Sequence, residues 1–163
     1  MRLQKLMRQS LIERLPEVLP LALHWAMEMQ ASCLEQGKPL AFWQLVDARN
    51  VGVAHPKRIR LCLVEAIPAP NHPALCAVAK EAGLLGSETV GLALGYALYL
   101  RKSHAGLRRI LRHELRHVAQ CEAMGGLGPF LAEYLGQVAE NGYSEAPLEV
   151  DARSYELGHD KVR

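Results

Sequence analysis

The sequence predicts an α+β fold that is mainly helical, with a small β-sheet packed on one central helix and a bundle of further helices behind it. Three observations predict this class. The stretch 103–126 combines a polar start, an apolar body and a closing pair of glycines, which is typical of a buried helix. The stretches 58–67 and 89–101 are rich in aliphatic residues that alternate with a period of two, which is typical of strands. Elsewhere apolar residues recur three or four positions apart, which indicates amphipathic helices.

The composition is that of a folded protein with one substantial core. The chain has 163 residues, of which 50% are hydrophobic and 22% are charged. This length suits a single domain better than two. The net charge of +2 is too small to indicate a nucleic acid partner.

The N-terminal stretch carries several basic residues, as a targeting segment does. Glu13, Arg14 and Glu17 interrupt its apolar positions, and no uncharged apolar run in the chain is long enough to span a bilayer. The cysteines are scattered among apolar neighbours without a CxxC pair, which indicates reduced core thiols: Cys33, Cys62, Cys76 and Cys121. We therefore expect a cytoplasmic protein without a membrane partner.

Helices are expected through the first fifty residues. The apolar positions of 2–14 suit one helical face, and a second helix is expected to begin near Pro16 and to end before Gly37. A short helix is expected over 40–49. The first strand follows over 58–67, and a helix over 74–82 stops at a glycine.

The stretch 89–101 is expected to be a single strand. Its large side chains fall on one face and its glycines and alanines fall on the other, and a helix would lose about 1 kcal/mol at each interior glycine. The small-residue face allows another backbone to approach closely. Packing is the first use expected for it, and pairing of its edge with an extended peptide is the functional alternative.

The central helix is expected to begin at Ser103 as N-cap and to stop at Gly125 and Gly126. Arginines that recur every fourth residue are expected to mark its solvated stripe: Arg108, Arg112 and Arg116. A helix over 130–140 and a last helix that starts after Pro147 complete the chain.

The central helix carries the pattern HExxH at His113, Glu114 and His117. Two histidines four residues apart project from the same face of a helix, so together they can bind one Zn²⁺ ion. Glu114 lies beside them, where it can act as the general base toward a zinc-activated water. The alternative is a pair of helical histidines that make ordinary hydrogen bonds.

A catalytic zinc site needs a third protein ligand from elsewhere in the chain. The candidates lie downstream of the helix: Glu133, Glu140, Glu145, Glu149, Asp151, Glu156 and His159. Glu149 is preferred because it lies at the start of a helix and Ala152, three residues later, leaves room for a neighbouring helix. Asp151 and then Glu133 are the next choices. An acid that stabilises a helix N-terminus is the alternative explanation of Glu149.

HELRHVAQ followed by PLEVDAR resembles the two ligand helices of gluzincin-type zinc metallopeptidases, in which a glutamate from a later helix completes the site. The wider pattern, from VGVAHPKRIRL through GLALGYALYLR to PFLAEYL and GYSEAPLEVDAR, is similar to a group of small, largely uncharacterised bacterial zincin-like proteins, and it covers about two thirds of the chain.

The resemblance implies a zincin-like fold with His113, His117 and Glu149 as zinc ligands and Glu114 as general base. It leaves the group that stabilises the transition state open, with Tyr143 and Tyr155 as the choices. No Met-turn region or third histidine linked to the HExxH motif follows. Each ligand histidine should also donate a hydrogen bond from its second ring nitrogen. The candidate acceptors are Asp151 and Glu156.

The expected function is therefore that of a zinc-dependent metallopeptidase, a hydrolase acting on a peptide or protein substrate. The alternative is a non-catalytic zinc-binding module with a regulatory or partner-binding role. A third hypothesis is that a basic stripe binds nucleic acid or an acidic partner, through Arg108, Arg109, Arg112 and Arg116. It is weaker because charged stripes are usually solvated helix faces. Within one domain over 1–163, the N-terminal helices fall in 1–57, the strand-containing part in 58–101 and the metal-site helices in 103–158.

Overall fold

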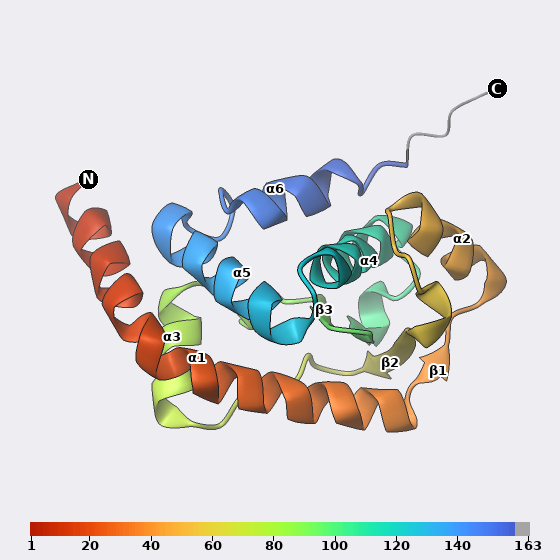
Figure 1. The fold of residues 1–163 in the computed structure, drawn as a ribbon, viewed down its shortest axis with the longest axis horizontal. Coiled ribbons are helices and arrows are strands. Elements are labelled where there is room, and N and C mark those ends of the chain that lie inside the picture. The colour runs from red at the N-terminus through yellow and green to blue at the C-terminus, as the bar shows by residue number, and fades with distance from the viewer. Residues whose placement is uncertain (159–163) are drawn as a thin grey trace.

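The computed structural model describes residues 1–158, in which helices surround one small sheet (Figure 1). The helices are α1 (Arg2–Gln36), α2 (Phe42–Asn50), α3 (Pro73–Glu81), α4 (Arg108–Ala123), α5 (Leu127–Asn141) and α6 (Pro147–Ser154). The strands are β1 (Lys38–Pro39), β2 (Arg60–Val64), β3 (Gly91–Leu94) and β4 (Ala97–Arg101). The predicted class, α+β and mainly helical, is confirmed.

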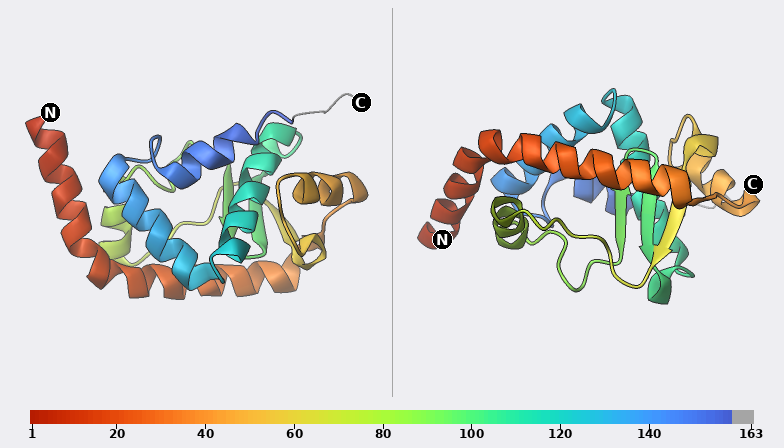
Figure 2. Two further views of the ribbon diagram at one scale, coloured as in Figure 1. Left: turned by 45° about the horizontal axis from the view of Figure 1, so that its top comes forward. Right: turned by 90° about the horizontal axis from the view of Figure 1, so that it is seen from below.

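The sheet has the strand order β1-β2-β4-β3, so β3 forms one of its edges. Strands β2 and β4 run parallel, and β3 pairs antiparallel with β4. Leu98 and Leu100 of β4 pack in a core cluster with α4, whereas Ala97 and Tyr99 pack in another with α1 and α5. The sheet is therefore covered on both faces, with α4 on one and α1 on the other; the right panel of Figure 2 shows α1 crossing the strands.

The single strand predicted over 89–101 is wrong, because this stretch folds into a β-hairpin. Leu94 pairs with Ala97, and Gly95 takes a φ of +62° in the two-residue turn between them. A glycine in the first position of such a turn is common in hairpins, since it reaches positive φ without steric cost. The reversal sends the large side chains of the two halves to opposite faces of the sheet.

The two N-terminal helices predicted over 2–14 and 16–36 are one helix, α1, which contains Pro16 and Pro20. Proline removes one backbone donor and bends a helix without always ending it, and Figure 1 shows α1 bent between its first turns and its longer remainder. Residues 1–10 are all exposed, so the first part of the predicted apolar stripe lies outside the core clusters. No helix within residues 1–158 has both the length and the apolar character needed to cross a membrane.

The central helix also begins later than predicted. Ser103 lies in a short 3-10 helix, Lys102–His104, and the N-cap of α4 is Leu107, whose side chain makes no capping hydrogen bond. The last described elements agree with prediction more closely, although α5 begins three residues early. The expected helices over 40–49 and 74–82 correspond to α2 and α3 within the usual uncertainty of helix ends.

An ion pair between a buried carboxylate and an exposed arginine connects α2 to α4. Asp47 is fully buried and accepts two hydrogen bonds of 2.7 Å from Nε and Nη2 of Arg108, while Nη1 of Arg112 lies 3.7 Å from Oδ1. The predicted solvated stripe of arginines is therefore wrong at Arg112, which is buried. Asp47 needs these cations because an ionised carboxylate without a partner is costly to bury.

This pair gives a prediction about stability. Arg108→Ala removes both 2.7 Å hydrogen bonds to the buried Asp47 and leaves it only the Arg112 cation at 3.7 Å, so the free energy of unfolding should fall by about 2 kcal/mol in urea titrations. Adding Asp47→Ala should restore part of the loss, because the unpaired charge is removed. Lys102→Ala, which breaks the exposed pair with Glu65, is the control and should leave the free energy of unfolding almost unchanged. A double variant less stable than Arg108→Ala would contradict this account.

Candidate metal centre

Helices α4 and α6 bring His113, His117 and Glu149 together. Nε2 of His113 lies 3.1 Å from Nε2 of His117 and 3.0 Å from Oε2 of Glu149, and Nε2 of His117 lies 3.2 Å from Oε1 of Glu149. All three side chains are largely buried. Two facing imidazole nitrogens and one carboxylate at these distances form a cluster that can hold a metal ion.

The cluster fits a tetrahedral cation in two respects. Ligand atoms about 2.0–2.1 Å from a tetrahedral ion are about 3.3 Å from one another, close to the separations in the structure. Among the described residues, Oε2 of Glu149 is also one of two buried side-chain polar atoms without a hydrogen bond. A buried carboxylate oxygen without a donor is costly, and a cation between the three residues would satisfy it.

Gln120 determines which nitrogen of His117 can bind an ion. Nε2 of Gln120 donates to the backbone oxygen of Leu148, at 2.9 Å, and to Oδ2 of Asp151, at 2.7 Å, so its Oε1 must face the imidazole. That oxygen lies 2.7 Å from Nδ1 of His117 and can only accept. Nδ1 therefore carries the proton, and Nε2 presents its lone pair to the cluster.

Arg116 holds Asp151 in place. Its Nε donates to Oδ2 of Asp151 at 2.7 Å, and its guanidinium lies 4.1 Å from the ring centre of Tyr155. Burial would raise the pKa of Asp151, but the hydrogen bonds from Arg116 and Gln120 outweigh it and lower that pKa. Asp151 thus acts on His117 through Gln120, and it is not a member of the ligand cluster.

Glu156 does for His113 what Gln120 does for His117. Its Oε1 lies 3.0 Å from Nδ1 of His113, and its Oε2 lies 3.6 Å from Nη1 of Arg109. The carboxylate accepts from Nδ1, so Nε2 of His113 is free to bind an ion. Of the two acids expected to accept hydrogen bonds from the histidines, Glu156 contacts His113 directly. Asp151 contacts only Gln120, which in turn contacts His117.

Glu114 lies beside the cluster but outside it. The carboxyl group is buried against β3, where a Cβ atom added to Gly91 would come within 2.6 Å of Oε1 of Glu114. Burial raises the pKa of Glu114, although the nearby His117 and His113 work in the opposite direction. The structure therefore places next to the cluster a carboxyl group with an increased affinity for a proton.

The two tyrosines proposed from sequence differ in their surroundings. Tyr143 is 43% exposed, and burial together with the charges of Glu149 and Glu114 raises its pKa. Tyr155 packs against the core cluster that contains α4 and lies under the guanidinium of Arg116. Of these two tyrosines, Tyr143 is therefore the one whose pKa is raised by the acids of the site.

Tyr134 was not among the residues expected at the site, but its hydroxyl donates a hydrogen bond of 2.7 Å to Oε1 of Glu149. Its ring also meets His117 edge to face at 5.9 Å. Gln120 was missed as well, although its position three residues after His117 on the same helix face could have indicated it. Tyr134 had no comparable local indication, because α5 reaches Glu149 only through the tertiary fold.

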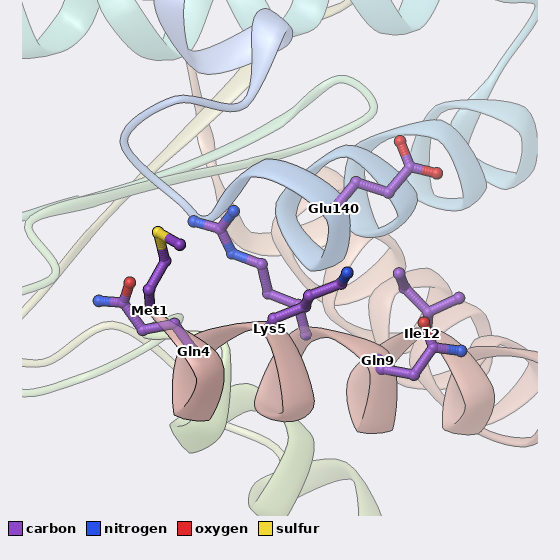
Figure 3. A pocket seen from close by; sticks show the side chains of 7 residues that line it. Met1, Gln4, Lys5, Gln9, Ile12 and Glu140 are labelled. Carbon is purple, nitrogen blue, oxygen red and sulfur yellow. The ribbon is translucent and has the colours of Figure 1, made fainter.

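The other third-ligand candidates lie outside the cluster. Glu133 is exposed and accepts a hydrogen bond from Gln137, and Glu140 and Glu145 are also exposed. His159 lies outside the described residues. A pocket of about 350 Å³ lies between the first turns of α1 and Glu140, and no residue of the metal cluster lines it. Figure 3 shows side chains that line this pocket.

Comparisons of the chain with protein-family models, with curated proteins and with solved structures give no match. The geometry of the site is therefore the basis for inferring its function.

The electrostatics of the metal-free cluster predict a pH dependence of stability. Burial lowers the pKa of His113, but contact with Glu149 and the charges of Glu114 and Glu156 outweigh it and raise the pKa from 6.5 to about 9. Burial also opposes ionisation of Glu149, yet the adjacent imidazoles hold its pKa well below its usual range. Below pH 6.5 the protonated His113 therefore contributes fully to stability, and this contribution disappears as the pH rises through 9.

The metal-free protein should accordingly lose up to about 3 kcal/mol of unfolding free energy between pH 6.5 and pH 9 through this one group. Urea titrations across this range measure the loss. A His113→Gln variant should lack this component, whereas His24→Gln, which alters an exposed histidine, should retain it. Identical pH profiles for the wild type and His113→Gln would contradict the assignment.

Proposed function

We propose that this chain is a zinc-dependent metallopeptidase with a zincin-like arrangement of its sheet and central helix. One observation carries the proposal. Glu114 lies buried beside His113 and His117 without belonging to the ligand cluster, so a carboxyl group is available for proton transfer next to the ion. A purely structural metal site has no need of such a group.

The ligand set favours zinc. Two imidazoles and one carboxylate are a common set for catalytic zinc, which keeps a fourth position for water or substrate. When bound, zinc would supply a Lewis acid that polarises a carbonyl group and increases the acidity of water. His113, His117 and Glu149 would hold it, and Glu156 and Gln120 would keep the two imidazoles in the ligating tautomer.

Glu114 would act as the general base and then as the general acid. A carboxyl group with a raised pKa can accept a proton from the attacking water and return it to the leaving amine nitrogen. Gly91 leaves the space that this carboxyl group occupies, because a Cβ atom at Gly91 would come within 2.6 Å of its Oε1. Tyr143, which is partly exposed near the same acids, is the candidate donor to the oxygen that becomes negative in the transition state.

A peptide would bind along the outer edge of β3. This strand pairs with β4 on one side and lies at the edge of the sheet on the other, and its Gly91 contacts Glu114. An extended chain that pairs with this edge would pass beside the general base. Peptide or protein substrates in the cytoplasm are thus the proposed substrates.

The second candidate function is a non-catalytic zinc module with a regulatory or partner-binding role. The depth of the site favours it, since Glu149 is 2% exposed, His117 6% and Glu114 8%. An ion at that depth could serve to hold α4 and α6 together.

One set of variants distinguishes the two functions. Zinc content after purification should be near one equivalent in the wild type and in Glu114→Gln, and should be lost in His113→Ala and Glu149→Ala. Cleavage of a peptide library should be present in the wild type and should fall at least about 100-fold in Glu114→Gln, because proton transfer is lost. Undiminished zinc-dependent turnover in Glu114→Gln would refute the assigned base. Zinc uptake without any cleavage by the wild type would favour the non-catalytic module.

The contact between Gly91 and Glu114 gives a separate prediction. In Gly91→Ala the new methyl group would overlap the carboxyl group of Glu114 and displace it, so kcat should fall about 10-fold or more while zinc content stays unchanged. Gly86→Ala is the control, because an added Cβ at Gly86 meets no atom within 4 Å. Equal activities for the two variants would show that the position of Glu114 does not depend on this contact.

A further inference from the structure

The two oxygens of Glu149 have different surroundings. Oε1 accepts a hydrogen bond of 2.7 Å from the hydroxyl of Tyr134 and lies 3.2 Å from Nε2 of His117. Oε2 makes no hydrogen bond within the described residues and lies 3.0 Å from Nε2 of His113. One oxygen of the carboxylate is thus already committed to a protein donor, and the other is left for an ion.

Tyr134 is itself held firmly. It projects from α5, its ring stacks on Phe130 with centres 5.7 Å apart, and it meets His117 edge to face. It packs with the core cluster that includes Phe130 and Leu148, the residue before Glu149. The hydroxyl can therefore fix the rotation of the carboxylate, because the ring that carries it has little freedom to move.

We propose that Tyr134 is a positioning residue that holds Oε1 of Glu149, so that Glu149 binds the metal through Oε2 alone. This inference rests on the metal site of the proposed function. A glutamate that binds through one oxygen uses one coordination position, whereas binding through both would occupy the position that a catalytic site keeps for water or substrate. Tyr134 thereby keeps the site open.

The test compares Tyr134→Phe with Tyr99→Phe. Tyr99 is a matched control, because its hydroxyl also makes a short hydrogen bond, 2.6 Å to the backbone oxygen of Met29, but away from the metal cluster. Thermal unfolding of both variants reports the general cost of losing a buried hydroxyl. The dissociation constant for zinc and the visible absorption of the cobalt-substituted protein report the site, since the cobalt bands weaken as the coordination number rises.

Tyr134→Phe should bind zinc about 10- to 100-fold more weakly than the wild type and should change the cobalt spectrum. Tyr99→Phe should keep both values. Unchanged zinc affinity and an unchanged cobalt spectrum in Tyr134→Phe would overturn the inference and leave the proposed function standing. A wild type that binds no zinc would overturn the proposed function, and the inference would fall with it.

A second measurement does not depend on the folding of any variant. A crystal structure of the zinc-loaded wild type should show Oε2 of Glu149 about 2.0–2.2 Å from zinc. Oε1 should still accept the hydrogen bond from the hydroxyl of Tyr134. Both oxygens within this distance of zinc, or a Tyr134 hydroxyl bonded elsewhere, would overturn the inference.

Discussion

The carboxylate of Glu149 is the constraint around which the C-terminal helices are arranged. It is 2% exposed, and an ionised group at that depth must be matched by a cation or by donors. While His113 is neutral, the two imidazoles and Tyr134 supply only part of this, since Oε2 accepts no hydrogen bond within the described residues. In the metal-free protein a proton on His113 provides the positive charge, and a metal ion would provide it without that proton.

The rest of the fold holds α4 in the position where its two histidines contact Glu149. The sheet packs on the helix through Leu98 and Leu100, and Asp47 of α2 binds Arg108 at the N-terminal end of α4. On another side Arg116 and Gln120 reach Asp151 of α6. The polar contacts that join α4 to α6 are thus the same ones that orient His117, so stability and site geometry depend on the same residues.

The site divides its tasks among residues of similar type. Glu149 is placed to bind a cation, Glu156 accepts a hydrogen bond from His113, and Glu114 keeps a raised pKa beside them without joining the cluster. All three residues are glutamates, so their different roles arise from their different surroundings. Burial, together with the charges of Glu149 and Glu156, raises the pKa of Glu114, whereas hydrogen bonds to two imidazoles outweigh burial and lower the pKa of Glu149.

The sequence by itself determined the features that depend on nearby residues. The spacing of His113 and His117 follows from the period of a helix, and the small Ala152 near Glu149 indicated a helix that can approach another closely. Only the tertiary structure decided the features that depend on distant residues. These include the hairpin at Gly95, the continuity of α1 through Pro16 and the hydrogen bond from Tyr134 to Glu149. Periodicity records which face of an element is apolar, but the element that covers this face is chosen by packing between segments far apart in the chain.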